Sequence, residues 1–395
     1  MANSKYEYVK CVELEKEVMF PNIFLVWINA CTLLKPYDVN ALKLMNSCVV
    51  AVLEEYAGVV LAYGFGNEYT FVFKKTSKFY ERRASKVLSI ITFIFSSVFV
   101  RKWGEFFPLK ELKYPPYFHG MNEREAWDFN KGFENSDLNN LLFDEFNVNY
   151  NTLEPIVRQG SFEFDSKLML STWIVVRIDG FHFHRFSEIH EFVKPNDDRA
   201  LKLMNSCAVA VLEEFQQDTV FAYRISDEYS FILKTTSNLY ERRANKIISE
   251  IVSFFTSTYV MRWKDFFAQR ELKYPPFDGR ALVASGKSKR EAQHNLKGAQ
   301  LQKKIEELSI DYNKLPVRFR QGCSVFWDKV DDLLIHQENG ECSDNYGKVI
   351  VEHVDIIGST FWLEHPNILD EKLSLCALVL GFWLCLSKQP NQELI

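Results

Sequence analysis

The 395-residue chain carries 47 Lys and Arg residues against 52 Asp and Glu residues, which gives a formal net charge of −5. Its hydrophobic fraction of 47% and charged fraction of 25% exclude a compositionally disordered protein. The length predicts two domains, and the acidic balance excludes nucleic-acid binding through the overall field of the chain. Any RNA contact must therefore come from local basic patches, such as ERR at 81–83 and 241–243 and the run at 287–290.

A tandem duplication organises the chain. Residues 41–56 and 200–215 agree at 14 of 16 positions. Several shorter motifs recur at a similar offset near 160, which is the length of a whole domain rather than of a solenoid repeat. The predicted organisation is an N-terminal copy at 1–160, a C-terminal copy at 161–372 and an apolar tail at 373–395.

In the C-terminal copy, a run rich in apolar and β-branched residues at 172–179 (TWIVVRID) predicts a buried strand. A helix is expected at 197–215, with Asp197 or Asp198 as its N-cap. Further along the chain, the pattern predicts strands at 219–226 and 228–234 and helices at 239–263 and 290–308. The order β-α-β-β-α is the core of a ferredoxin-like or palm sheet, so the predicted fold class is α+β with two tandem palm-like modules.

Two acidic motifs stand at the ends of these predicted strands. Asp179 closes the first strand and precedes Gly180, and Asp227 lies between the second and third strands. Two carboxylates that face one pocket can hold Mg²⁺ ions about 3.5–4 Å apart for phosphoryl transfer. The N-terminal copy has Asn29 and Asn67 at the matching positions, and an amide lacks the negative charge that a hard cation prefers. The sequence therefore predicts one module with a metal site and one without.

The motifs RIDG, HRF, KPND, RALKLMN and SDEYSF, with YERRANK and KYPPFDGR, resemble those of the tRNA-His guanylyltransferase family. The C-terminal stretch at 355–369 is similar to the end of that family as well. The resemblance covers almost the whole chain as two copies. It implies a polymerase-palm-like fold and addition of a guanosine nucleotide to the 5′ end of tRNA-His, with ATP, GTP and two Mg²⁺ ions. It also implies oligomers with the same chain or with other family members.

The resemblance further implies roles for individual residues. Asp179, Gly180 and Asp227 would bind the metal ions, and Lys194 would be catalytic with the two acids. The nucleotide would be bound by the following residues: Asp179, Gly180, Phe181, His182, Phe183, His184, Ser226, Asp227, Arg243 and Lys246. Arg243 and Lys246 are three residues apart and so share a helix face. For Glu228, a supporting role beside the metal site and an ordinary turn carboxylate stay equally open.

The sequence departs from the family pattern after FDGR at 277–280. The family continues there through a strand and a helix that carries H-I-N-N, whereas neither copy of this chain has that sequence. Each module is therefore expected to lack a strand and a helix. Phe181, Arg224 and Ile225 also stand where smaller or more polar residues are usual.

Three hypotheses follow. The chain is a guanylyltransferase that works through its C-terminal copy, or a catalytically dead tRNA- or nucleotide-binding subunit that assembles with a full-length relative. The third is a 3′-to-5′ polymerase that repairs truncated tRNAs with the same site. The N-terminal copy is expected to be non-catalytic and to serve mainly as a scaffold.

The eight cysteines form no CxxC pair, which argues against a structural zinc site and predicts reduced thiols in the cytosol or nucleus, with the nucleus expected. The polar N-terminus predicts no signal peptide. The nearly apolar run at 373–387 is shorter than the roughly 20 residues of a spanning helix. We therefore expect a packed tail and no membrane association, with a tail anchor as the alternative.

Overall fold

The computed structural model describes residues 24–30, 38–65, 68–74, 76–122, 167–180, 182–194, 196–273, 277–284, 316–327, 348–354, 356, 359–365 and 368. The expected helix at 290–308 and the tail at 373–395 lie outside these residues.

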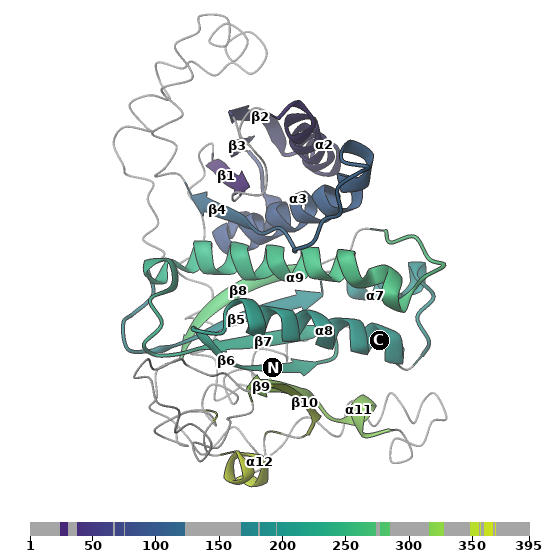
Figure 1. The fold of residues 1–395 in the computed structure, drawn as a ribbon. Coiled ribbons are helices and arrows are strands. Elements are labelled where there is room, and N and C mark those ends of the chain that lie inside the picture. Colours follow the sequence, from purple (N-terminus) through teal and green to yellow (C-terminus); the bar gives the residue numbers. More distant parts are fainter. Residues whose placement is uncertain are drawn as a thin grey trace, which may run out of the picture.

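In the described part of the N-terminal copy, two long helices accompany a four-stranded antiparallel sheet (Figure 1). Its strands stand in the order β2-β3-β1-β4. Its elements are β1 (Phe24–Ala30), α2 (Val39–Glu55), β2 (Val59–Phe65), β3 (Glu68–Phe73), α3 (Ala84–Phe106) and β4 (Phe118–Asn122).

The C-terminal copy repeats this arrangement in the order β6-β7-β5-β8 and extends it with β9 and β10 into a six-stranded sheet. Its elements are β5 (Trp173–Gly180), α7 (Phe183–Ile189), α8 (Asp198–Glu214), β6 (Thr219–Ile225), β7 (Glu228–Leu233), α9 (Ala244–Phe266), β8 (Phe277–Ala284), α11 (Val317–Arg320), β9 (Cys323–Trp327), β10 (Val349–His353) and α12 (Ser359–Glu364).

Most of the predicted elements occur where the sequence placed them, and the α+β class is confirmed. Asp197 is the N-cap of α8, and its side chain accepts a hydrogen bond from the Arg199 amide. The predicted helix at 239–263 is a turn at Leu239–Arg242 followed by α9. In that turn Tyr240, Glu241 and Arg242 all have positive φ, and the same three residue types at Tyr80–Arg82 repeat it before α3. A left-handed run of non-glycine residues is not readable from helix periodicity.

The expected loss of a sheet strand from each module is wrong for the segments that follow the ELKYPP motifs. Residues 277–284 form β8, which pairs with β5 along its whole length. In the N-terminal copy β4 pairs with β1 in the same way. The outer edge of β5 is thus covered by a backbone ladder, and the aggregation hazard of an open edge does not arise there.

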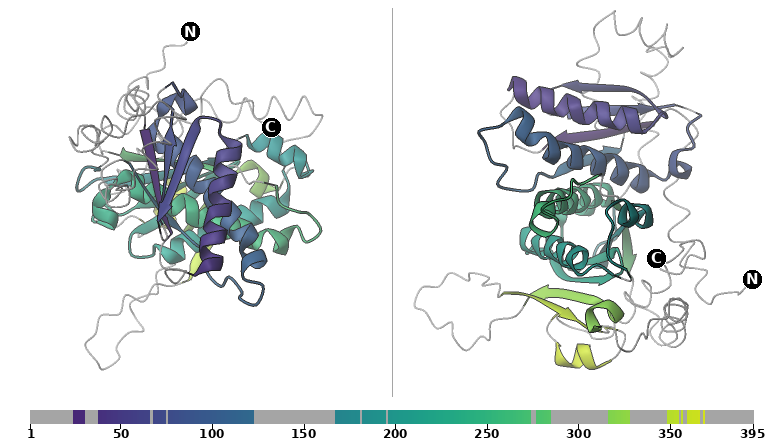
Figure 2. Two further views of the ribbon diagram at one scale, coloured as in Figure 1. Left: turned by 90° about the horizontal axis from the view of Figure 1, so that it is seen from above. Right: turned by 90° about the vertical axis from the view of Figure 1, so that its right-hand side faces the viewer.

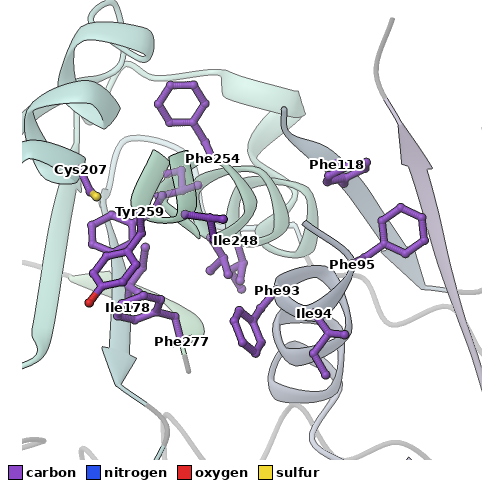
Figure 3. Close-up of a cluster of buried hydrophobic side chains, with 14 of the residues drawn as sticks. Phe93, Ile94, Phe95, Phe118, Ile178, Cys207, Ile248, Phe254, Tyr259 and Phe277 are labelled. Atoms are coloured by element: carbon purple, nitrogen blue, oxygen red, sulfur yellow. The ribbon is translucent and has the colours of Figure 1, made fainter. Parts of the chain in front are cut away.

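The two copies pack through their long helices, α3 and α9, which lie side by side between the copies (Figures 1 and 2). The contacts are reciprocal, because α3 also packs on β8 and α9 also packs on β4. Buried residues of both copies form one hydrophobic cluster. Figure 3 shows Phe93 projecting from α3 toward Ile248 and Phe277 of the other copy.

Helix α3 is also the one described helix that is long and apolar enough to cross a membrane by length and composition. Most of it is buried inside the protein, and its position against α9 explains why it is apolar almost all round. We therefore assign α3 to the core between the copies.

Candidate active site

The two predicted metal-binding acids come together at one end of the C-terminal sheet. Asp179 and Gly180 end β5, and Asp227 lies in the turn between β6 and β7. Because β5 and β7 pair antiparallel, the end of β5 lies beside the start of β7. A Cβ added to Gly180 would collide with Oδ2 of Asp227 and would lie 2.7 Å from Cβ of Phe183. The Asp227 carboxylate therefore sits directly against the Gly180 backbone.

A buried arginine links this pair of acids to a third carboxylate. The Arg177 side chain is 4% exposed and forms an ion pair with Glu228, and its Nη2 lies 3.6 Å from Oδ2 of Asp179. Arg177 precedes Asp179 by two residues, so both side chains leave the same face of β5. This resolves the question left open for Glu228, which is a buried partner of Arg177 rather than an ordinary turn carboxylate.

The electrostatics of the acids suit a cation. Burial, together with repulsion by Asp179, raises the pKa of Asp227 to about 7. A divalent ion would offset the repulsion between the two carboxylates and favour the deprotonated form of Asp227, since metal ligands must be deprotonated. Two carboxylates and the Gly180 carbonyl are hard oxygen donors of the kind Mg²⁺ takes.

The described residues contain no cluster of three or more His, Cys, Asp or Glu side chains that could hold a metal ion. A site with two acidic side chains is still compatible with Mg²⁺. This ion usually binds through one or two carboxylates and completes its shell with water and substrate phosphates. The residues present therefore fit a magnesium site that is finished by the substrate.

The predicted nucleotide residues that follow Gly180 lie at the same end of the sheet. His182 is exposed, has a φ of 51° and precedes α7, and exposed His184 pairs with Glu188 at 2.9 Å. Phe183 is part-buried, and its ring centroid lies 6.3 Å from that of Phe277. Ser226 is exposed with a φ of 55°. Phe181 lies outside the described residues.

Lys194 is exposed in the segment between α7 and α8. Nearby Phe192 stacks on Phe267, with ring centroids 5.3 Å apart, and lies 6.2 Å from the ring of Phe183. The amide of Val193 donates to Oδ2 of Asp197 at 3.2 Å. The loop that carries Lys194 is thus anchored near the Gly180 end of β5.

Arg243 and Lys246 lie elsewhere, and this differs from the expectation that they share the pocket of the acids. Arg243 forms an isolated β-bridge with Lys167, and neighbouring Arg242 donates to the carbonyl of Thr172 at 2.8 Å. Thr172 precedes the first residue of β5, whereas Asp179 is close to its end. At about 3.3 Å per residue, roughly 20 Å of strand separates the two places. Arg243 is the N-cap of α9 and Lys246 lies in its first turn, and helical spacing gave no information on which end of the sheet they occupy.

The N-terminal copy presents a different set of side chains at the matching place. Asn29 lies in β1 opposite Glu68 of β3, and Trp27 occupies the position that corresponds to Arg177. Asn67 lies outside the described residues. Neither the first acid nor the arginine that accompanies it is present in this copy.

The sequence did not single out Arg177 and Asn205, two polar residues near the acids, and Arg224 stood out only as a departure from the family pattern. All three are buried. A signal was available for the arginines, because each interrupts a run of apolar residues in a predicted buried strand. Asn205 gave no comparable signal, since an amide within an amphipathic helix is common.

The model of a family described as tRNAHis guanylyltransferase matches residues 6–122 and 156–285. The chain is 41% identical to tRNA(His) guanylyltransferase 1 of Arabidopsis thaliana, over 93% of this chain and 91% of that protein. It is 40% identical to tRNA(His) guanylyltransferase 2 of the same plant, over 93% of this chain and 99% of that protein.

The first of these alignments extends over 524 positions, more than the 395 residues of this chain. The relative therefore has internal segments with no counterpart here, in agreement with the absent H-I-N-N regions.

Solved structures are similar over shorter stretches. The tRNA(His) guanylyltransferase of Saccharomyces cerevisiae shares 34% identity over 43% of this chain and 91% of that one, with a TM-score of 0.36. A bacterial Thg1-like protein in complex with GTP shares 20% identity over 55% of this chain and 99% of that one, with a TM-score of 0.42.

Proposed function

The chain belongs to the tRNA-His guanylyltransferase family, and we propose that its C-terminal copy adds a guanylyl group to the 5′ end of tRNA-His. The observation that carries the proposal is the meeting of Asp179 and Asp227 against the backbone of Gly180 in that copy. The N-terminal copy belongs to the same family but has an asparagine in place of the first acid.

The reaction has two transfers. The 5′-phosphate of the tRNA attacks the α-phosphate of ATP, which forms an adenylylated 5′ end and releases pyrophosphate. The 3′-hydroxyl of GTP then attacks the 5′-phosphate of the tRNA, the new phosphodiester bond forms and AMP leaves. Loss of pyrophosphate from the added GTP finally leaves a 5′-monophosphate.

Phosphoryl transfer asks little covalent chemistry of the protein, so positioning and charge dominate. Asp179 and Asp227 would hold Mg²⁺, which lowers the charge on the reacting phosphates and orients the attacking oxygen. Arg177 lies between Asp179 and Glu228, and its contact with Oδ2 of Asp179 orients that carboxylate. Lys194 and the two histidines at 182 and 184 are exposed beside this site and available to the substrates.

Arg243 and Lys246 are proposed to contact a different phosphate from those that react. Their distance from the acids, about 20 Å along the strand, is too great for one reacting phosphate to touch both groups. The side chain of Arg243 is held by Glu241 at 3.3 Å and is 40% exposed, so it remains available to an anionic partner.

The proposed role of the N-terminal copy is that of a scaffold. Its helix α3 supplies half of the core between the copies, and β4 packs on α9. The palm-like modules would thus form an internal pair in which one member is catalytic and the other supports it.

The test is incorporation of labelled GTP into 5′-monophosphorylated tRNA-His in the presence of ATP and Mg²⁺. Asp227→Ala and Asp179→Ala should each lower the rate by at least about 100-fold, since the metal contributes several kcal/mol to the transition state. The matched control Asn29→Ala should leave the rate unchanged.

Equal losses from Asp179→Ala and Asn29→Ala would contradict the assignment of the chemistry to the C-terminal copy. Folded wild-type protein that incorporates no label would instead support the dead-subunit hypothesis, and copurification with a full-length relative would then be sought.

A further inference from the structure

Arg224 of β6 is a buried guanidinium that neither the acids nor the proposed chemistry uses. It is 3% exposed and lies in the strand that leads into the Asp227 turn. Its Nε donates to Oδ1 of Asn205 in α8 at 3.1 Å, and its Nη1 donates to the carbonyl of Ser226 at 2.9 Å. The side chain therefore ties the turn that carries Asp227 to a helix beneath it.

The charge of Arg224 has no carboxylate partner among the described residues, and its Nη2 is buried without a hydrogen-bond partner. Its lateral neighbours in the sheet are Tyr229 and Cys323. A buried charge without a carboxylate partner among these described neighbours is energetically unfavourable. An arginine that served stability alone would be expected to form an ion pair with a carboxylate. The feature of Arg224 that needs an explanation is therefore its two directed hydrogen bonds, to Asn205 and to Ser226.

The turn that Arg224 holds is itself unfavourable. Ser226 has a φ of 55°, in the left-handed region that is unfavourable for a residue with a side chain. The hydrogen bond from Arg224 ends on the carbonyl of this residue, which is the peptide group that leads into Asp227. Without that bond the turn can relax, and the carboxylate would move away from the Gly180 backbone.

The N-terminal copy provides an internal comparison. Tyr69 donates to Asn46 at 2.5 Å there, as Tyr229 donates to Asn205 at 2.7 Å in the C-terminal copy. The tyrosine–asparagine bond is thus common to both copies and serves the shared fold. At the position of Arg224, however, the N-terminal copy has Gly64. Within this chain the arginine occurs only in the copy that has the acids, and it is a feature of this chain, because smaller or more polar residues are usual at this position in the family.

We propose that Arg224 is a positioning residue that fixes the Ser226–Asp227 turn and thereby sets the metal-binding geometry of Asp227. The inference rests on the proposed function for its catalytic consequence, but its structural part concerns the turn alone. The sequence of the N-terminal copy has Gly64 and Gly66 where the C-terminal copy has Arg224 and Ser226.

The experiment compares Arg224→Gly, which introduces the residue of the other copy, with Arg224→Lys and wild type in the full chain. Three quantities are measured: hydrogen exchange of a peptide that spans 226–231, the affinity for Mn²⁺ by electron paramagnetic resonance, and kcat and KM for GTP. We expect faster exchange at the turn and an affinity for Mn²⁺ lowered about 10- to 100-fold in Arg224→Gly, as for other residues that orient metal ligands. kcat should fall, with little change in KM.

Arg262→Ala is the matched control, because Arg262 also donates to a backbone carbonyl of the same module, that of Ser206 at 2.7 Å. It should lower stability without changing exchange at 226–231 or Mn²⁺ binding. Arg224→Lys keeps the charge but not both directed bonds, so we expect intermediate affinity. If Arg224→Gly does not fold, the lysine variant decides the same question.

Wild-type exchange and Mn²⁺ affinity in both Arg224 variants would overturn the inference, and so would equal losses in Arg262→Ala. A failure of the proposed function looks different: wild-type protein would transfer no guanylyl group, while the exchange and Mn²⁺ measurements would still report whether Arg224 holds the turn.

Discussion

Gly180→Ala tests the contact on which the candidate site depends. The added methyl group would collide with Oδ2 of Asp227 and would come within 2.7 Å of Cβ of Phe183. The Asp227 side chain can rotate away from the added methyl group, but Cβ of Phe183 cannot move without its backbone. Either the Asp227 carboxylate or the start of α7 must therefore move.

The expected cost follows from these contacts. Overpacking of this kind destabilises a protein by about 1–3 kcal/mol. A displacement of about 1 Å at a reacting centre lowers the rate by roughly 100-fold. We therefore expect a modest fall in the thermal midpoint together with a large loss of guanylyl transfer and weaker Mn²⁺ binding.

Gly104→Ala is the matched control, because Gly104 lies in α3 and an added Cβ would meet nothing within 4 Å. It should stabilise the protein by up to about 1 kcal/mol through helix propensity and leave activity intact. Thermal unfolding and incorporation of labelled GTP are measured for both variants. Full activity and unchanged Mn²⁺ affinity in Gly180→Ala would refute the apposition of Gly180 and Asp227.

Two further predictions concern α9. Glu250 accepts a hydrogen bond from Tyr240. Burial raises the pKa of Glu250 from 4.5 to about 8. Between pH 4.5 and 8, therefore, this carboxyl is protonated mainly in the folded state. Stability should thus fall with rising pH by up to about 1.4 kcal/mol per unit, and Glu250→Gln should flatten that slope in denaturant unfolding at pH 5 to 8. An unchanged slope in the variant would contradict this assignment. Ser253→Ala removes the acceptor for the Phe118 amide of the other copy, 3.0 Å away, and should cost about 1–3 kcal/mol in the same assay. Ser257 lies on the same helix, and its hydroxyl has no hydrogen bond among the described residues. Ser257→Ala should therefore lower the free energy of unfolding far less than Ser253→Ala. Equal losses would argue against the hydrogen bond between the copies.

The local features of the chain could be predicted from its sequence because they depend on neighbouring residues. The strand at 172–179 was predicted from a mostly apolar run. The N-cap of α8 was predicted from an aspartate that precedes a segment with helical periodicity. The pairing of Asp179 with Asp227 was also within reach, because a β-α-β-β order places the end of one strand beside a turn of the same sheet. The duplication identified the second module without any structural information.

The tertiary structure decided what depends on distant parts of the chain. Helical periodicity predicted that Arg243 and Lys246 share a face, but only the bridge between Arg243 and Lys167, before β5, placed the start of α9 at the far end of the sheet. The apolar character of α3 alone is compatible with a membrane, whereas its contact with α9 shows that it is a core helix.

The same distinction holds within the site. A charged residue in a buried strand can be recognised from the sequence, but its partner cannot, because Arg177 and Glu228 are 51 residues apart and meet only through the sheet register. Arg224 holds the Asp227 turn through a carbonyl two residues away and an amide of α8. The sequence by itself thus determined which chemical groups the chain has and its local elements, whereas packing across long loops decided which of those groups face one another.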